Sequence, residues 1–140
     1  MGAFGVVAAY QLGLLRRPPE PGLPGLDAAR VDASGEAYAL ARTPDAALGL
    51  VSHAATLVLA GMGDRHRSTR HPLLPLLLAA KVVVDAAGSG LLTVEQATKH
   101  RRFCGWCLLA AATTVAAVPS AVPEASAAWR HLRNGRRRRG

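Results

Sequence analysis

Residues 103–122 read FCGWCLLAAATTVAAVPSAV, and none of these twenty side chains is charged. An α-helix rises about 1.5 Å per residue, so a helix of this length covers the roughly 30 Å hydrocarbon core of a bilayer. This stretch is the clearest of four apolar segments in the chain. It predicts a membrane-spanning helix.

Three further apolar segments precede it, at residues 1–15, 46–62 and 72–92. The first is uncharged but short, so it spans a bilayer only if Arg16 and Arg17 extend toward the headgroups. A cleaved signal peptide is the alternative for this segment, but positive charge precedes the apolar run of a signal peptide and here follows it. We therefore expect a retained helix and an all-α, four-helix transmembrane bundle, with an outward loop between its first and second helices.

The composition agrees with a membrane protein. Hydrophobic residues make up 50% of the 140-residue chain and charged residues 19%, which excludes an intrinsically disordered protein. The formal net charge is +8, but six of the 17 lysines and arginines lie in residues 130–140. Positive charge gathered at one end of an apolar chain is typical of a segment that flanks a membrane, so we expect no nucleic-acid partner.

The distribution of positive charge also predicts the orientation. With four spans, loop 63–71 and the C-terminal tail share one side and carry nine lysines and arginines, against seven on the other side. Cytoplasmic segments are enriched in Lys and Arg, so the C-terminus is expected in the cytoplasm and loops 16–44 and 93–102 outside. We expect residues 1–128 to form the membrane domain and residues 129–140 a basic cytoplasmic tail.

Cys104 and Cys107 form a CxxC pair at the start of the last predicted span. Residues three apart share one helix face, so the two sulfurs can approach to bonding distance. The positive end of the helix and the adjacent His100, Arg101 and Arg102 stabilise a thiolate, which favours a redox-active pair. Two other interpretations stay open: inert buried thiols, or half of a metal site completed by another chain.

Three ionisable residues fall inside the other predicted spans. Lys81 and Asp85 are spaced i,i+4 on one helix face, which favours a buried ion pair over a proton relay. His53 lies in the middle of the second span, where a packing role is favoured over contact with a ligand. Trp106 lies between the two cysteines, and its most direct interpretation is an aromatic side chain at the membrane interface. His53 and Trp106 are kept as candidates for contact with a cofactor.

Four short spans with FCGWCLLAA at the outward start of the last one resemble the vitamin K epoxide reductase family of membrane thiol oxidoreductases. Residues 30–57, RVDASGEAYALARTPDAALGLVSHAATL, are similar to that family's passage from the outward loop into its second helix. The resemblance covers residues 1–128 and is most specific at residues 31–49 and 103–107.

The resemblance implies a four-helix bundle around a quinone (ubiquinone or menaquinone), with the CxxC pair carrying two electrons between thiols and that quinone. Cys104 and Cys107 match the redox pair. Ser34 matches a serine in the family's loop, and Asp45 falls where a quinone-contacting Asn often lies. The chain departs from the family in two respects: no cysteine precedes Cys104, so the loop pair is missing, and Ala111 stands where a quinone-contacting Tyr is expected.

With the resemblance, the sequence predicts a bacterial inner-membrane or cell-membrane thiol–disulfide oxidoreductase that supports disulfide formation. Cys104, nearer the outward surface, is expected to exchange with a thioredoxin-like or other thiol protein, and Cys107, one turn deeper, to face the quinone. The other expected partner is membrane lipid, and no metal is expected. The alternative function is a non-catalytic four-helix scaffold or partner-binding protein that has lost the electron relay.

Overall fold

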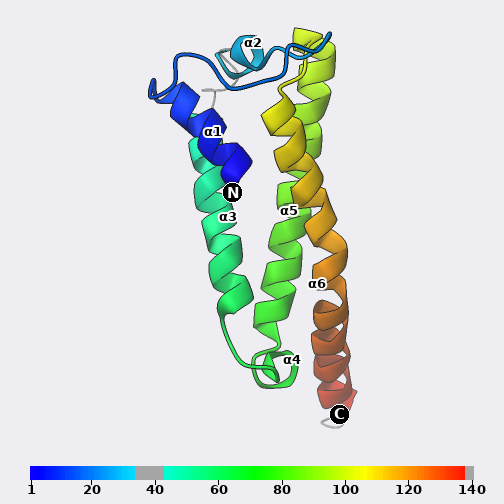
Figure 1. Cartoon of the computed structure of the whole chain (residues 1–140). Coiled ribbons are helices and arrows are strands. Elements are labelled where there is room, and N and C mark those ends of the chain that lie inside the picture. The colour runs from blue at the N-terminus through cyan, green and yellow to red at the C-terminus, as the bar shows by residue number, and fades with distance from the viewer. Residues whose placement is uncertain (34–42, 138–140) are drawn as a thin grey trace.

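The computed structural model of the chain describes residues 1–33 and 43–137, which are mainly helical and contain no strand (Figure 1). The all-α prediction is confirmed for these ranges. A π-helical turn, Gln96–His100, continues α5 without a break. The helices are α1 (Gly2–Gln11), α2 (Ala28–Asp32), α3 (Asp45–Gly61), α4 (Arg67–Arg70), α5 (Leu73–Glu95) and α6 (Gly105–Arg137).

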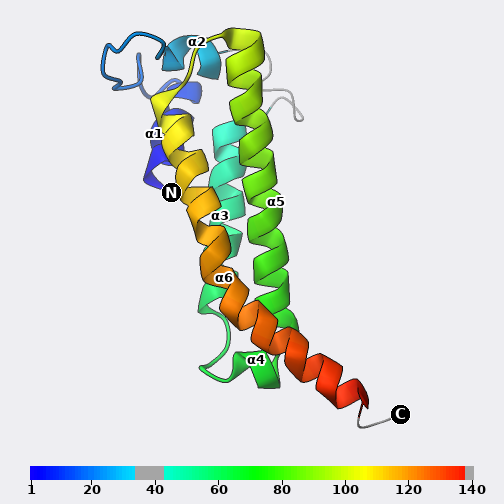
Figure 2. The same ribbon diagram turned by 90° about the vertical axis from the view of Figure 1, so that its right-hand side faces the viewer.

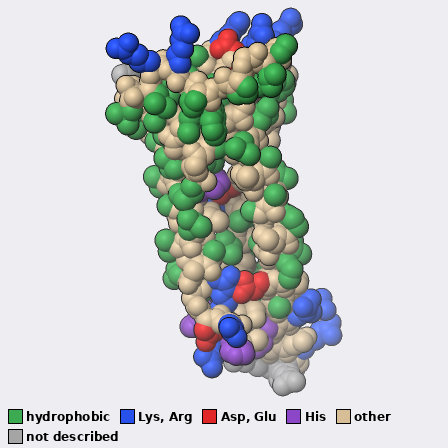
Figure 3. Space-filling model, viewed as in Figure 1, with side chains coloured by type: hydrophobic (Ala, Val, Ile, Leu, Met, Phe, Trp, Pro, Cys, Tyr) green, Lys and Arg blue, Asp and Glu red, His purple; other side chains and the backbone are tan. Residues whose placement is uncertain are grey.

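Two helical segments are long and apolar enough to cross a bilayer, Leu73–His100 and Gly105–Arg137. Many of their large apolar side chains face outward, and the Val84 and Leu91 side chains are about 70% exposed. Figure 3 shows Lys and Arg side chains gathered toward the two ends of the molecule, with hydrophobic side chains along the length between them. An apolar girdle between charged ends is the pattern that a bilayer requires.

The other two predicted spans are shorter than a bilayer core. α3 has 17 residues, whereas α1 has 10 and so rises only about 15 Å. The prediction of a helix over residues 1–15 is therefore too long. α1 ends near Gly13, whose φ of 77° is a left-handed conformation that glycine adopts without strain and that commonly follows the end of a helix.

α3, α5 and α6 run side by side along the length of the molecule, and α1 packs against the first half of α3 and against α6 (Figures 1 and 2). Phe4 of α1 lies directly over Gly49 of α3, so closely that a Cβ at Gly49 would overlap the Phe4 ring. The missing side chain thus allows the two helices to cross. α2 and the segment before it lie across the end of the bundle where α6 begins.

α6 continues well beyond the apolar run that predicted it. It passes through Pro119 and Pro123 and through the predicted domain boundary at residue 128 without interruption. Each proline removes one intrahelical hydrogen bond, which neighbouring helices and Ser or Thr side chains can offset in a membrane protein. The described part of the basic tail, up to Arg137, is therefore a helical projection (Figure 2).

Arg67 joins α3 to α6 at the end of the bundle where α3 ends. Its Nε and Nη2 donate to the two carboxylate oxygens of Glu124 on α6, both at 2.5 Å. Its Nη1 donates to the carbonyl oxygens of Leu59, Ala60 and Met62 at the end of α3. The last carbonyls of a helix have no intrahelical partner, so one guanidinium caps α3 and ties it to α6.

Arg67→Lys should lower the free energy of unfolding by about 2 kcal/mol, because an ammonium cannot reproduce the two-pronged bond to Glu124 together with the three carbonyl contacts. Denaturant unfolding in detergent, followed by circular dichroism, measures the change. Arg70→Lys is the matched control, since its ion pair with Asp64 is largely exposed and should contribute little. Equal effects of the two substitutions would contradict this assignment.

Candidate functional site

A strap, defined here as residues 16–27, crosses the start of α6. It is rich in proline, which lacks a backbone donor and disfavours helix, so the strap stays extended. Its end pairs with Phe103: the Phe103 N–H donates to the Gly25 carbonyl and the Asp27 N–H donates to the Phe103 carbonyl, both at 2.9 Å. Trp106 Nε1 donates to the Pro19 carbonyl at 2.9 Å. The strap is thus held against the first turn of α6.

Glu20 of the strap caps two helices at once. Its Oε1 accepts from the Gly105 N–H at 2.5 Å and its Oε2 from the Ala28 N–H at 2.7 Å. The first N–H groups of α6 and of α2 have no intrahelical acceptor, and both helix ends carry partial positive charge. One carboxylate therefore satisfies both ends and fixes α2 beside α6. A glutamate among prolines gave no sign of this role in the sequence.

The two cysteines meet one carboxylate, that of Asp32 at the end of α2. Cys104 Sγ donates to Asp32 Oδ2 and Cys107 Sγ donates to Asp32 Oδ1, each at 3.3 Å. The Cys107 N–H donates to Cys104 Sγ at 3.2 Å, as expected for residues three apart in the first turn of a helix. Both cysteines are free thiols. The two sulfurs therefore lie close together, as the CxxC spacing predicts. The spacing does not predict that Asp32 lies beside them.

Asp32 is only 2% exposed, and burial raises its pKa to about 6. The two thiol hydrogen bonds act in the opposite direction and lower the pKa, whereas the negative charges of Asp45 and Glu20 raise it slightly further. The position of α2 causes this burial: Asp27 caps the helix by accepting from the Arg30 N–H at 3.0 Å, and α2 is turned so that Asp32 faces α6. An acid with a raised pKa beside two thiols is typical of a proton-transfer site.

Cys104 is completely buried, with no exposed surface, whereas Cys107 is partly buried. The expectation that Cys104, the sulfur nearer the outward surface, exchanges with a thiol protein stays a prediction. The strap covers this sulfur, and hydropathy alone does not position the strap. Gln96 of the π-helical turn closes the other side, its Oε1 accepting from the Cys104 N–H at 3.0 Å.

Cys107 forms part of the wall of a cavity among α1, α2, α3, α5 and α6. The surface of the cavity is mainly apolar, and polar side chains from α2, α3, α5 and the π-helical turn also line it, which is typical of small-molecule sites. Asp45 and Trp106, two of the predicted cofactor contacts, also line it. Its lining is Ala3, Phe4, Val7, Val31, Asp32, Asp45, Ala46, Ser89, Leu92, Thr93, Glu95, Gln96, His100, Trp106, Cys107, Ala110 and Ala111.

Gln11 positions Asp45 at the edge of this cavity. Gln11 Nε2 donates to Asp45 Oδ1 at 2.7 Å and to the Asp32 carbonyl at 3.3 Å, and its Oε1 accepts from the Ala46 N–H at 3.3 Å. One amide at the end of α1 thus joins α2 and α3. The sequence did not indicate this role for Gln11.

Another predicted cofactor contact, His53, does not line this cavity. His53 contacts the Gly49 carbonyl at 2.9 Å and the Thr114 hydroxyl at 3.1 Å, and its ring packs at a tilt against the Phe4 ring, so its side chain lies between helices. Ser34 lies outside the described residues.

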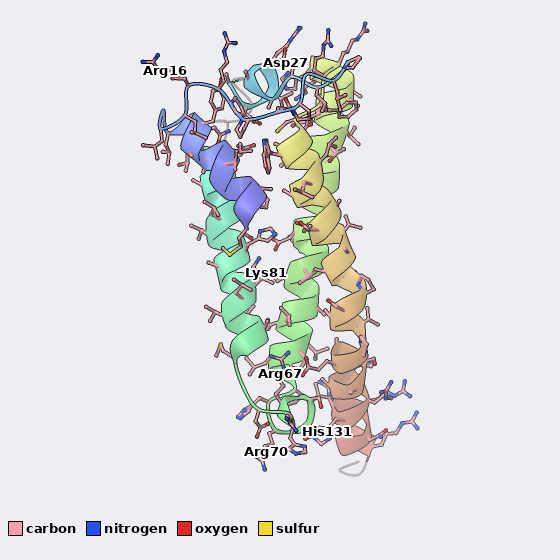
Figure 4. The ribbon with its side chains drawn as sticks, viewed as in Figure 1. Arg16, Asp27, Arg67, Arg70, Lys81 and His131 are labelled. Atoms are coloured by element: carbon pink, nitrogen blue, oxygen red, sulfur yellow. The ribbon has the colours of Figure 1, made fainter. Side chains whose placement is uncertain are left out.

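Lys81 and Asp85 pair as predicted, in the middle of the molecule between α3 and α5 (Figure 4). Lys81 Nζ lies 2.6 Å from Asp85 Oδ2 and 2.7 Å from Ser52 Oγ, and Ser52 Oγ donates to Asp85 Oδ1 at 2.9 Å. Thr56 adds a longer contact of 3.5 Å to the same carboxylate. Each charge therefore has partners on both helices, which is the arrangement of a structural ion pair.

The oxygen and sulfur atoms of Asp32, Cys104 and Cys107 all lie within 4.8 Å of one another. A closed structural zinc site needs four ligands, and within residues 1–33 and 43–137 no histidine or further acid joins these three. The described residues thus do not complete such a site.

A model of the vitamin K epoxide reductase family matches residues 1–122 of the chain. No curated protein and no solved structure gives a match. The family match and the two long apolar helices together indicate an integral membrane protein.

Proposed function

Because the chain belongs to the vitamin K epoxide reductase family, we propose that it is a membrane thiol–disulfide oxidoreductase in which the Cys104–Cys107 pair exchanges electrons with a membrane quinone. The observation that carries the proposal is the position of the pair. Cys104 directly precedes α6 and Cys107 lies in its first turn, where the Cys107 N–H donates to Cys104 Sγ, and Cys107 forms part of the wall of a mainly apolar cavity.

The residues of the cavity suit a quinone. Apolar side chains of α1, α3 and α6 suit the ring and its lipid-like tail. Thr93 and His100 can donate hydrogen bonds to the oxygens of the quinone, and the carboxylate of Asp45 can accept one from a hydroxyl of the reduced quinol. A bound quinone, ubiquinone or menaquinone, supplies an acceptor for two electrons and two protons. The pair loses the same number when two S–H bonds are replaced by one S–S bond. Trp106 and Asp45 are the proposed cofactor contacts, and Ser34 remains a further candidate in the loop.

The proposed arrangement in the membrane is a bundle of four helices, α1, α3, α5 and α6, of which α1, only about 15 Å long, reaches part of the way across the bilayer. The strap and α2 then lie on the outward face, and the Arg-rich end of α6 lies in the cytoplasm. Exposed apolar side chains on α3 and α5, such as Val51 and Val84, support contact with lipid along both helices. In this arrangement residues 1–128 form the membrane domain of a bacterial membrane protein, and residues 129–140 form its basic cytoplasmic tail.

The proposed protein partner is a thioredoxin-like or other thiol protein at the outward face. Since no cysteine precedes Cys104, thiols from outside must reach the CxxC pair directly. Cys104 lies under the strap, so exchange with a protein requires the strap to move. Exchange then proceeds through a mixed disulfide.

The test is the redox state of the two cysteines in membranes that contain the full chain. After reduction, addition of a short-chain ubiquinone or menaquinone should convert the dithiol to the disulfide, read as protected thiols by maleimide–polyethylene glycol gel shift. Cys107→Ala should abolish this conversion and leave Cys104 able to hold a mixed disulfide with an added thiol protein. Thr113→Ala, on the same helix but away from the cavity, is the control and should behave as the native chain.

A pair that keeps both thiols free at saturating quinone would exclude the quinone-linked activity. If the pair also forms no mixed disulfide with an added thiol protein, the alternative stands, a non-catalytic four-helix scaffold or partner-binding protein. The ion pair of Lys81 and Asp85 supports a stable scaffold but serves an enzyme equally well, so it does not separate the two.

A further inference from the structure

Asp32 is the one carboxylate that contacts either sulfur in the described part of the chain. Each of its two oxygens accepts from one thiol, and both contacts are 3.3 Å long. The strap, α2 and the π-helical turn cover Cys104, so water has no direct route to its sulfur. A thiol must lose its proton before its sulfur can act as a nucleophile, and here the nearest acceptor is a side chain.

We propose that Asp32 is a catalytic residue of this site and acts as the proton acceptor of the Cys104–Cys107 pair, becoming protonated when the pair is oxidised. The inference rests on the proposed redox function of the pair. It also gives a role to an acid outside the CxxC motif, contributed by α2 from more than seventy residues earlier in the chain.

The step balances as follows. Two S–H bonds break and one S–S bond forms, two electrons pass to the oxidant, a quinone or another disulfide, and the reduced oxidant takes up two protons. Asp32 accepts a proton from a thiol as the thiolate forms and keeps it, while solvent supplies one proton to the oxidant. Oxidation of the pair thus takes up one proton overall, on Asp32. Reduction of the pair returns it.

Asp32 retains the proton because its hydrogen bonds change. In the dithiol form, two S–H donors stabilise the charged carboxylate. The disulfide has no S–H group, so a buried carboxylate would remain without those donors, and the neutral acid is favoured. The charged groups that act on Asp32 do not offset this change, because Glu20 of the strap and Asp45 of α3 are both acids. Glu95 of α5 and His100 of the π-helical turn are the other titratable groups that line the same cavity. Gln11 of α1 contributes only an uncharged amide.

The test is the equilibrium with dithiothreitol, which needs no quinone. Both dithiols release two protons on oxidation, so the equilibrium constant does not vary with pH unless another group changes its protonation. The pKa of Asp32 in the dithiol form is about 6. For the native chain in nanodiscs, the constant for oxidation of the pair should be flat below about pH 6. Above it, the constant should fall by up to tenfold for each pH unit, because Asp32 is then charged in the dithiol and protonated in the disulfide.

Asp32→Asn should make the constant independent of pH from 5 to 8. Asp27→Asn is the matched control: it removes a carboxylate from the same short helix, keeps a good capping residue, and should follow the native profile. Infrared difference spectra of the native protein provide a measurement that needs no variant. The disulfide-minus-dithiol spectrum at pH 7 should contain the carbonyl band of a protonated carboxylic acid.

A native profile as flat as that of Asp32→Asn, or a spectrum without the acid band, overturns the assignment of Asp32. If quinone still oxidises the pair in that case, the proposed function stands without it. If the pH profile is as expected but quinone never oxidises the pair, Asp32 keeps its role and the quinone is the part that fails.

Discussion

Asp85→Asn should lower the free energy of unfolding by about 3 kcal/mol or more, because it leaves the ammonium of Lys81 without its countercharge between α3 and α5. The pair lies at 2.6 Å, and only 21% and 17% of the two side chains are exposed. In a bilayer that exposure is to lipid and not to water, so the cost is not screened. Unfolding in mixed detergent micelles, followed by circular dichroism, measures the loss.

The double variant Lys81→Met with Asp85→Leu should recover most of that stability, since removing both charges costs far less than leaving one buried charge without its partner. Glu95→Gln is the matched control. Glu95 forms the same i,i+4 pair with Lys99 at 2.7 Å, but 38% of the Glu95 side chain and 50% of the Lys99 side chain are exposed, so the change should be less than about 0.5 kcal/mol. If the double variant is as unstable as Asp85→Asn, the unpaired charge of Lys81 does not cause the loss of stability.

Glu20→Ala should raise the rate at which a maleimide modifies Cys104 by about a hundredfold, because two charge-assisted hydrogen bonds that hold the strap are lost, each worth about 1.5 kcal/mol. The experiment uses a Cys107→Ala background, in which Cys104 is the only thiol of the chain. Cys104 has no exposed surface, so modification reports opening of the strap. Rates are measured by mass spectrometry of the intact protein.

Glu20→Gln should give an intermediate rate, since the amide keeps one acceptor oxygen for the N–H of either Gly105 or Ala28. Glu95→Ala removes a carboxylate that does not contact the strap and should leave the rate within about threefold of the background. Modification that is equally slow in Glu20→Ala would mean that the pairing at Phe103 holds the strap without the carboxylate.

Local sequence was sufficient for the helices whose apolar runs are long. Hydropathy predicts α3, α5 and α6 because a membrane helix satisfies its own backbone and needs only an apolar surface. It overestimates the length of α1, because the end of this helix depends on Gly13 and on the contacts that Gln11 makes with α2 and α3. It also underestimates the length of α6, because polar and basic residues continue a helix that has already begun.

Periodicity and hydropathy are local properties, so they suffice to predict an apolar, helical protein with two cysteines one turn apart at the start of its last long helix. What surrounds those cysteines depends on tertiary packing. Asp32 lies 72 and 75 positions away along the chain and Glu20 more than eighty, and no local pattern relates such distances. The short helix α2 and the extended strap are both fixed by capping and long-range hydrogen bonds. They bring Asp32 to the two thiols and Glu20 to the start of α6.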